Sequence, residues 1–304
     1  MPIRSLNGLR YHVAEHGTGL EAILLLHGFT GSSASWAPVV DRLAERYRVL
    51  APDLIGHGAT EAPEDVSRYR IDRAADDLIA LLDELGLPTV HWVGYSMGAR
   101  LALHAALRHP SRVNTLTLES GSPGLASLAE RETRVAADSA LADRIERDGI
   151  EAFVAHWEAL PLFASQVVLS VETRAALHTA RLRNDPRGLA HSLRGMGTGA
   201  QPSNWEALAA FQRPAHLIVG ALDAKFVAIA EQMQARLPNA RRTIVPDAGH
   251  TIHVEQPAAW CEAVLAGLSN ESLSPPPTPR PSRTATRRTR PSHRAASRRV
   301  GPHP

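Results

Sequence analysis

Cysteine is nearly absent from this 304-residue sequence, with Cys261 its single instance, in a helical pattern where we expect it to pack. One thiol cannot form a disulfide within the chain, so we expect a reducing setting. Long apolar runs are absent as well. Residues 1–4 do not begin a signal peptide, and no stretch approaches the ~20 apolar residues needed to cross a membrane. The sequence therefore predicts a non-exported, cytoplasmic protein without stable membrane insertion.

Acidic residues are scarce at the end of the chain. The charge of the whole chain therefore hides the net negative charge of the residues before this segment. Residues 271–304 hold eight of the 33 basic side chains but only one of the 31 acidic ones. Residues 1–270 therefore carry 25 basic and 30 acidic side chains, a net charge of −5 with histidine neutral. We expect no nucleic acid as a partner of this larger part.

The terminal segment, residues 271–304, consists mainly of proline, serine, threonine and arginine. Because it offers almost nothing apolar to a core, we predict a disordered basic tail. Two interpretations of the tail stay open: it contacts RNA or anionic lipid, or it is a dispensable extension.

Strand and helix patterns alternate along most of residues 1–270. The run at residues 22–26 is apolar throughout, which is typical of a strand buried on both faces of a parallel sheet. Before it, Asn7-Gly8 predicts the turn of a hairpin. Further strands are expected at residues 48–53, 90–95, 113–118, 215–220 and 242–245, and helices at residues 36–46, 71–86, 97–109, 226–237 and 257–268. This alternation predicts an α/β fold with a mostly parallel central sheet.

The alternation is interrupted between residues 120 and 212, where helical patterns occur without a convincing strand. We interpret this segment as a helical cap, inserted over the sheet, that shapes a substrate pocket. The predicted organisation is thus a core in two parts, residues 1–119 and 213–270, with the cap at 120–212 and the tail at 271–304.

A Gly-x-Ser-x-Gly motif, residues 94–98, follows the expected strand at 90–95 and begins a helical pattern. Glycine on both sides lets neighbouring backbone close in on a strained strand-to-helix turn and leaves the hydroxyl of Ser96 exposed. The helix that follows directs its N-terminal amides toward that hydroxyl, which favours negative charge there. We therefore predict Ser96 at a nucleophile elbow.

A reactive serine needs a base within hydrogen-bond reach and an acid that orients the base. Asp223 follows the expected strand at 215–220, and His250 follows the strand at 242–245, so both lie at strand ends where such partners belong. Asp223 could instead serve only as the N-cap of the next helix. His253 is the alternative base, although we expect it to line the loop.

Two backbone amides are candidates for an oxyanion hole, those of Phe29 and Met97. Phe29 lies between two glycines in His27-Gly28-Phe29-Thr30-Gly31, and Met97 follows Ser96 directly. We expect His27 to brace its loop rather than to transfer protons. Asp53 and His57 are expected to fix loop geometry.

These motifs, taken together, resemble the α/β-hydrolase superfamily over residues 3–268. Within it, the chain is similar to the 2-succinyl-6-hydroxy-2,4-cyclohexadiene-1-carboxylate synthases of menaquinone biosynthesis. The segments that carry this resemblance are residues 27–31 with Trp36, residues 94–100, residues 119–125, Trp157 with residues 161–163, residues 182–184, residues 195–202, residues 223–226 and residues 248–250. The cap segments are the specific part, since caps vary most among these hydrolases.

The resemblance implies that arginines hold the carboxylates of a small polycarboxylate substrate. Arg100 lies one helical turn beyond Ser96, so it can face the same cavity. Arg134 and Arg183 match the family's cap arginines, and each could make a charge-assisted contact. Tyr95 and Trp157 are expected to line the pocket. The competing interpretation is solvated arginines and aromatic residues packed in the core.

The resemblance further implies elimination of pyruvate without an acyl-enzyme, a metal or an organic cofactor. In this scheme His250, oriented by Asp223, draws the proton from Ser96, whose oxygen removes an acidic C–H proton. The alternative is a carboxylesterase or C–C bond hydrolase that uses the same triad on a carboxylate-bearing substrate. A binding or receptor protein would be expected to have lost a triad member, and here none is lost. We expect a monomer or weak homo-oligomer.

Overall fold

The central sheet has eight strands, in the spatial order β1-β2-β4-β3-β5-β6-β7-β8. The computed structural model describes residues 3–269 and 301. The strands are Ile3–Leu6 (β1), Leu9–His16 (β2), Ala22–Leu26 (β3), Arg48–Pro52 (β4), Val90–Tyr95 (β5), Val113–Glu119 (β6), Ala215–Gly220 (β7) and Ala240–Val245 (β8). The pairs β1–β2 and β2–β4 are antiparallel, and every other pair is parallel. The α/β fold with a mostly parallel sheet is confirmed, and the carboxyl ends of its parallel strands meet at one edge.

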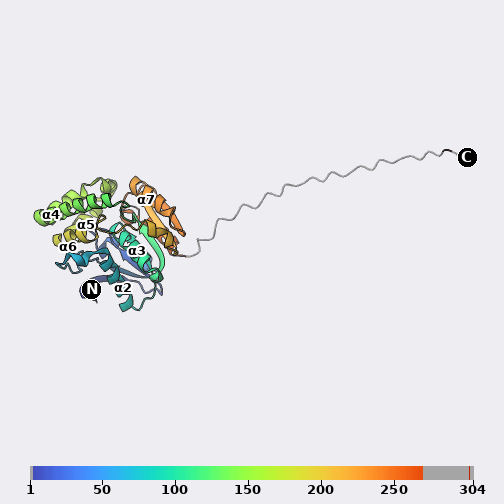
Figure 1. Cartoon of the computed structure of the whole chain (residues 1–304), viewed down its shortest axis with the longest axis horizontal. Helices are drawn as coiled ribbons and strands as arrows, with labels where there is room; N and C mark the ends of the chain where they lie inside the picture. The colour runs from blue at the N-terminus through green and yellow to red at the C-terminus, as the bar shows by residue number, and fades with distance from the viewer. Residues whose placement is uncertain (1–2, 270–300, 302–304) are drawn as a thin grey trace. The chain divides into compact units, whose positions relative to one another are not determined.

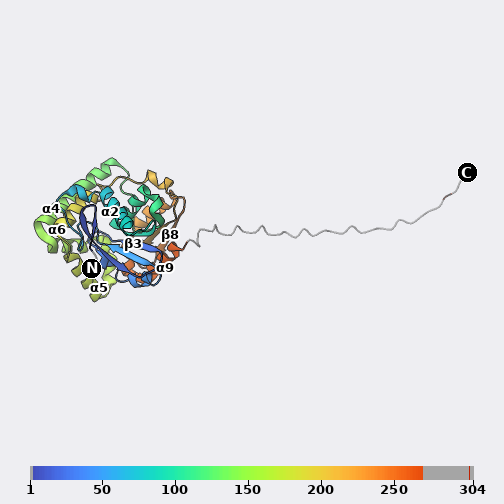
Figure 2. The same ribbon diagram turned by 90° about the horizontal axis from the view of Figure 1, so that it is seen from below.

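Helices cover both faces of this sheet (Figures 1 and 2). Successive residues of a strand point to opposite faces, so Leu24 and Leu26 of β3 join one core while Ile23 and Leu25 join the other. The helices of the first core are Ile71–Glu84 (α2), Met97–Arg108 (α3) and Ala224–Gln234 (α7), and those of the second are Val40–Ala44 (α1) and Pro257–Leu268 (α9). Burial on both faces explains why the strand sequences are apolar without alternation.

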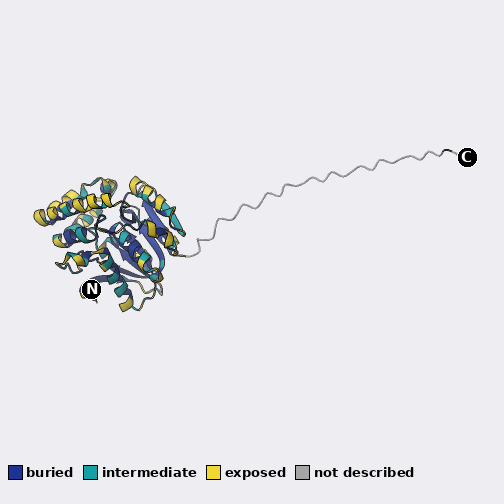
Figure 3. Ribbon diagram, in the orientation of Figure 1, coloured by how far each residue is buried: buried dark blue, intermediate teal, exposed yellow. Residues whose placement is uncertain are grey.

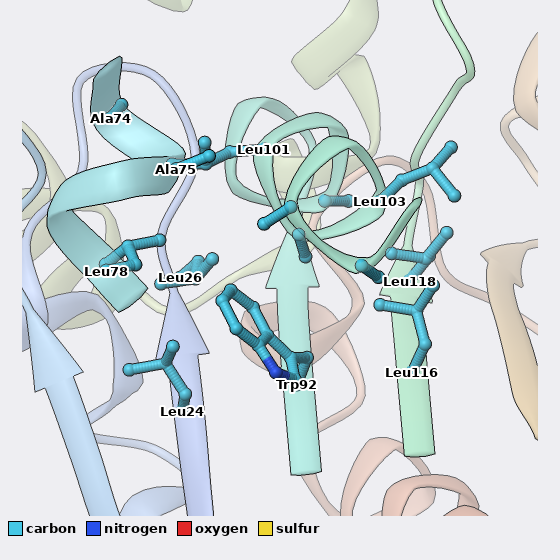
Figure 4. Close-up of a cluster of buried hydrophobic side chains, with 14 of the residues drawn as sticks. Leu24, Leu26, Ala74, Ala75, Leu78, Trp92, Leu101, Leu103, Leu116 and Leu118 are labelled. Carbon is cyan, nitrogen blue, oxygen red and sulfur yellow. The ribbon is translucent and has the colours of Figure 1, made fainter. Parts of the chain in front are cut away.

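The core that supports the catalytic edge lies between β3, β5, β6 and helices α2 and α3 (Figure 4). Trp92 in the middle of β5 is fully buried and points into it beside Leu24 and Leu116. The indole Nε1 of Trp92 donates to the carbonyl oxygen of Arg112 at 3.1 Å, which satisfies its one polar atom. Strand β5, which leads to Ser96, is therefore held rigidly on both sides.

The helices between β6 and β7 form a separate layer with a core of its own. They are Leu128–Glu158 (α4), Val171–Leu182 (α5) and Pro186–Met196 (α6), with the 3-10 helices Pro161–Val168 (η4) and Glu206–Ala210 (η5). Ile145 and Phe153 of α4 pack with Leu189 and Leu193 of α6, while the outer surface of α4 is exposed (Figure 3). Gly149, with φ 82°, divides α4 into two helical segments. Residues 120–212 contain no strand, as the sequence indicates.

Several local predictions can be compared with this arrangement. The hairpin at Asn7-Gly8 is confirmed, with φ of 46° and 84° at the two turn residues. The helix expected at residues 36–46 is wrong in its first half. A 3-10 helix, Ser33–Trp36 (η1), ends where this helix is expected to begin, and residues 37–39 form a turn. Pro38 has no amide hydrogen to continue a helix, and α1 begins only at Val40. The predicted tail lies outside the described residues apart from Gly301, and none of the described helices is long and apolar enough to cross a membrane.

Two buried histidines should make the fold sensitive to acid. Burial is the main reason that the pKa of His57 and of His216 falls to about 3, and charge repulsion from His27 and from Arg241, respectively, contributes to the same shift. The unfolded chain, where histidine titrates near 6.5, binds more protons between these pH values. Stability is therefore complete above about pH 6.5 and decreases as the pH falls toward 3, by about 1.4 kcal/mol per pH unit for each histidine.

Replacing His216 by glutamine should reduce this acid sensitivity. Between pH 6.5 and 5 the wild-type free energy of unfolding should fall by about 2 kcal/mol more than that of His216→Gln, because the variant has no imidazole to protonate in the unfolded state. Urea unfolding at a series of pH values measures the difference. Parallel pH dependences for the two proteins would show that His216 is readily protonated in the folded state.

Candidate active site

Ser96 lies between the end of β5 and the start of α3, in a backbone conformation that is rare for a residue with a side chain. Its φ is 50° and its ψ is −106°. The Ser96 amide donates to the carbonyl oxygen of Glu119 on β6 at 2.9 Å, and the Arg100 amide donates to the carbonyl oxygen of Ser96 at 3.0 Å. These bonds hold a strained turn, as is common where a side chain must be presented for chemistry.

The glycines around this turn are required by close packing. A Cβ on Gly98 would collide with the carbonyl group of Leu26, so the first turn of α3 lies directly on β3. A Cβ on Gly28 would lie 2.5 Å from the Tyr95 ring and 3.5 Å from Ser96 Cβ. The loop after β3 therefore packs closely against Ser96, which explains the glycines in both motifs, residues 27–31 and 94–98.

The structure brings Ser96, His250 and Asp223 together from the ends of three strands. Ser96 Oγ lies 3.0 Å from His250 Nε2, and His250 Nδ1 lies 2.7 Å from Asp223 Oδ2. The His250 and Asp223 side chains are almost fully buried. This geometry lets Nδ1 donate to the carboxylate while Nε2 accepts the serine proton, so the three residues can work as a relay.

Asp223 is both the acid that orients His250 and the N-cap of the next helix, the two interpretations that the sequence left open. Its Oδ1 accepts the amide of Phe226 at 3.3 Å, so Asp223 is the N-cap of α7 while its Oδ2 bonds to His250. The Phe226 ring then packs on the His250 imidazole, with ring centroids 4.6 Å apart. One carboxylate thus fixes both the histidine and the helix that packs against it.

The structure places Phe29 and Met97, whose amides are the predicted oxyanion donors, at the same cavity as Ser96. Met97 is the first residue of α3, so its amide precedes the first hydrogen bond within the helix. Phe29 lies in a turn closed by the Gly31 amide on the carbonyl oxygen of Gly28 at 3.0 Å. Both residues line the same cavity as Ser96. Their role as oxyanion donors stays a prediction.

A cavity of about 210 Å³ opens above Ser96 and His250. Its walls are the turn after β3, the turn at Ser96, the loop after β6, the helices α4, η4 and α6, and the start of α7. Its lining residues are Phe29, Tyr95, Ser96, Met97, Arg100, Ser120, Ser122, Gly124, Leu125, Arg134, Trp157, Leu162, Phe163, Ser192, Leu193, Met196, Gly197, Thr198, Trp205, Lys225, Phe226, Ile229 and His250. Three of these carry a permanent positive charge and none is acidic, so the cavity favours anionic ligands.

Arg100 and Arg134 are brought to this cavity, as predicted. The Arg100 guanidinium donates to the carbonyl oxygen of Met196 at 2.9 Å and to the Gln201 side chain, so it links α3 to the cap. Burial, together with the charge of Arg134, lowers the pKa of Arg100 to about 10, so the group keeps its proton at neutral pH. Arg134 pairs with the buried Asp138 at 2.7 Å and remains half-exposed.

The structure does not bring Arg183 to the cavity. Arg183 is the C-cap of α5, and its side chain is exposed, whereas the next residue, Asn184, is buried. The Asn184 amide nitrogen donates to the carbonyl oxygen of Thr30 at 2.9 Å, so it is this residue that joins α5 to the turn after β3. Arg183 is not among the residues that line the cavity, and its expected contact with substrate stays a prediction.

Tyr95 and Trp157 both line the cavity, and both are also packed. The Tyr95 hydroxyl bonds to Thr251 Oγ1 at 2.8 Å, and burial raises the pKa of Tyr95 well above its usual value. The Trp157 ring meets the edge of Phe29 at a centroid distance of 5.2 Å. Each ring therefore forms a fixed wall of the pocket.

His253 is not a second base. Its Nδ1 lies 2.9 Å from both carboxylate oxygens of Glu119, and the Trp260 indole donates to the same carboxylate at 2.8 Å. Glu119 is fully buried at the end of β6, one residue before Ser120, whose hydroxyl donates to the carbonyl oxygen of His250 at 2.9 Å. Glu119 and Ser120 were not identified from the sequence as residues that support His250. The one available signal is the position of Ser120 at a strand end, where its backbone has a positive φ of 48°.

The residues expected to shape the neighbouring loops do so. His27 Nε2 accepts the Leu54 amide at 2.9 Å, and burial lowers the pKa of His27. Asp53 accepts the amides of Ser33 and Ala59, which, despite the burial of the carboxylate, lowers its pKa. Within residues 3–269 and 301, no cluster of three or more His, Cys, Asp or Glu side chains could hold a metal ion.

Comparison with known proteins places this geometry in a family. The family described as "alpha/beta hydrolase fold" matches residues 21–257. A Bacillus subtilis (strain 168) protein provisionally named 2-succinyl-6-hydroxy-2,4-cyclohexadiene-1-carboxylate synthase is 48% identical over 265 residues, which cover 87% of this chain and 96% of that protein. The chain belongs to this synthase family of α/β-hydrolase-fold proteins. A Serratia proteamaculans (strain 568) synthase of the same name is 35% identical, over 82% of this chain and 93% of the relative.

Solved structures agree with the synthase family and with its wider superfamily. MenH from S. aureus superposes with a TM-score of 0.81 at 34% identity, over 85% of this chain and 97% of MenH. A thermophilic esterase from Thermogutta terrifontis, with malate bound, gives a TM-score of 0.78 at 26% identity, over 88% of this chain and 97% of the esterase. The resemblance drawn from the sequence motifs is thereby confirmed.

Replacing Arg100 by methionine should weaken the binding of small polycarboxylates about tenfold or more, because a hydrogen bond to a charged group contributes about 1.5–3 kcal/mol. Calorimetric titration with citrate at low ionic strength measures the affinity. Arg187→Met is the matched control, since Arg187 is exposed on α6 and pairs with Glu64 outside the cavity. Equal citrate affinity in wild type and Arg100→Met would contradict this assignment.

Proposed function

We propose that this chain is a carbon–oxygen lyase of menaquinone biosynthesis. It eliminates pyruvate from 2-succinyl-5-enolpyruvyl-6-hydroxy-3-cyclohexene-1-carboxylate and forms 2-succinyl-6-hydroxy-2,4-cyclohexadiene-1-carboxylate. The observation that carries this proposal is a serine–histidine–aspartate relay that opens into a cavity with three cations and no acid. Membership of the synthase family supports it.

The proposed substrate matches the charge of the cavity. It carries three carboxylates, on the succinyl group, the ring and the enolpyruvyl group. Arg100 and Arg134 supply positive charge from the elbow helix and the cap, and the apolar walls formed by Phe29, Trp157 and Phe163 suit a cyclohexene ring. Charge-assisted contacts of this kind position a substrate as well as bind it.

The first step is proton abstraction. The product has new double bonds at ring positions 2 and 4, so the proton leaves C2, the carbon that bears the succinyl carbonyl. His250 accepts the Ser96 hydroxyl proton through Nε2, and the Ser96 oxygen takes the C2 proton. Asp223 stabilises the imidazolium through Nδ1. Negative charge moves onto the succinyl carbonyl oxygen, where the Phe29 and Met97 amides can stabilise it.

The second step breaks the bond between C5 and the enolpyruvyl oxygen. The electron pair from C2 shifts the ring double bonds and expels enolpyruvate, which takes up a proton and becomes pyruvate. His250 returns to its neutral state when it gives up its proton, so the enzyme is unchanged. No bond forms between Ser96 and the substrate, and this chemistry requires no metal or organic cofactor. We further propose that the enzyme acts in the cytoplasm as a monomer or weak homo-oligomer.

A carboxylesterase is the second candidate function. The relay and the paired amides of this site would also suit ester hydrolysis, and the malate-bound esterase is a structural neighbour. The two functions differ in what Ser96 does, since an esterase forms an acyl-enzyme and the lyase only moves a proton. Neutral esters gain nothing from a cationic cavity, which favours the lyase.

Replacing Ser96 by alanine should reduce pyruvate release from the cyclohexene substrate by roughly 10²–10⁴-fold, because the oxygen that takes the C2 proton is lost. A coupled assay with lactate dehydrogenase follows pyruvate. Ser122→Ala is the control and should lose far less activity, because Ser122 lines the same cavity but its hydroxyl accepts the Gly124 amide and has no part in the relay.

The same assay separates the two candidate functions. Wild-type protein should release pyruvate rapidly and cleave p-nitrophenyl acetate slowly. Rapid cleavage of the acetate ester without pyruvate release would favour the esterase and reject the lyase.

A further inference from the structure

Lysine occurs once in this chain, at position 225, among 33 basic residues that are otherwise all arginine. This single lysine lines the catalytic cavity. Lys225 is therefore the one side-chain ammonium group of this sequence, and it lies at the cavity that holds Ser96 and His250.

Lys225 belongs to the first turn of α7, two residues after Asp223 and next to Phe226. Its Nζ lies 5.7 Å from the centroid of the Phe226 ring, and that ring packs on His250 at 4.6 Å. The ammonium group is thus separated from the catalytic imidazole by one aromatic ring. Arg100 and Arg134 approach the cavity from α3 and α4, so Lys225 adds positive charge from a different element.

The three cationic side chains of the cavity, Arg100, Arg134 and Lys225, differ in how many of their N–H donors already bond to protein groups. Arg100 donates to Met196 and Gln201, and Arg134 donates to Asp138. Within residues 3–269 and 301, Lys225 has no carboxylate within ion-pair distance and no hydrogen-bond acceptor. It is exposed, and its ammonium group lies against the Phe226 ring. All three of its N–H donors are therefore free for a ligand.

We propose that Lys225 is a further substrate-binding residue, which contacts one carboxylate of the polycarboxylate substrate on the α7 side of the cavity. An ammonium group is a compact point charge on a flexible stem, and it can meet a carboxylate from many directions where a planar guanidinium requires a fixed plane. This inference rests on the proposed function for the identity of the substrate. In this role, Lys225 fixes the end of the substrate that lies nearest His250.

Kinetics of three variants test the contact. Lys225→Met should raise KM for the cyclohexene substrate at least about tenfold and change kcat much less, because a charged contact is lost without disturbing the relay. Lys225→Arg keeps the charge and should recover most of this loss. Arg10→Met, an exposed residue on β2, removes one positive charge far from the cavity and is the matched control. Equal KM values for wild type and Lys225→Met would overturn the proposal.

Chemical labelling tests it without catalysis. Because the chain has one lysine, acetic anhydride can modify a single side-chain amine, and the terminal α-amine provides an internal reference. Citrate or the reaction product should slow acetylation of Lys225 at least about fivefold relative to the α-amine, as measured by peptide mass spectrometry. If ligand does not change the rate of Lys225 acetylation relative to that of the α-amine, the proposal is overturned.

The two readouts also separate this inference from the proposed function. If wild-type protein releases no pyruvate but citrate still protects Lys225, the function is wrong and the carboxylate contact stands. If pyruvate is released while Lys225→Met keeps its KM and labelling is unprotected, the contact is wrong and the function stands.

Discussion

The strained backbone at Ser96 is the constraint on which the rest of this site depends. A φ of 50° costs free energy for a residue with a side chain, and it persists because packing around it leaves no alternative. The Ser96 amide is bound to β6, and Gly98 seats α3 directly on β3. This one turn sets the position of the Ser96 hydroxyl, the position of Met97 at the start of α3 and the position of Arg100 one helical turn later.

A second set of buried contacts holds the histidine side of the relay in register with that turn. Glu119 bonds to the His253 ring and to Trp260, so the end of β6 is tied to the helices after β8. Ser120 then holds the carbonyl oxygen of His250. The Ser96 amide also donates to the carbonyl oxygen of Glu119, so the serine and the histidine are both held by the same end of β6. Their 3.0 Å separation is therefore a property of the sheet rather than of mobile loops.

The sequence predicted most where a residue's role follows from local order along the chain. The buried strands, the hairpin at Asn7-Gly8 and the strand-end positions of Ser96, Asp223 and His250 all have signals within a few residues. It could not identify contacts that depend on residues far away along the chain. Nothing near Arg183 shows that Asn184 takes the contact with Thr30, and nothing near Glu119 identifies Trp260 as its partner. Such contacts are tertiary, so pattern and propensity cannot supply them.

A serine–histidine–aspartate relay does not determine by itself whether the serine oxygen attacks a carbonyl or removes a proton. Both reactions need the same basic oxygen and the same amides for an oxyanion, so the choice lies in how the substrate is held. Here the cations stand on different elements around Ser96, and no acid lines the cavity. Contacts with carboxylates at several points would fix which substrate atom faces the serine oxygen. Substrate positioning, rather than a change in the relay, can therefore convert a hydrolase scaffold to elimination.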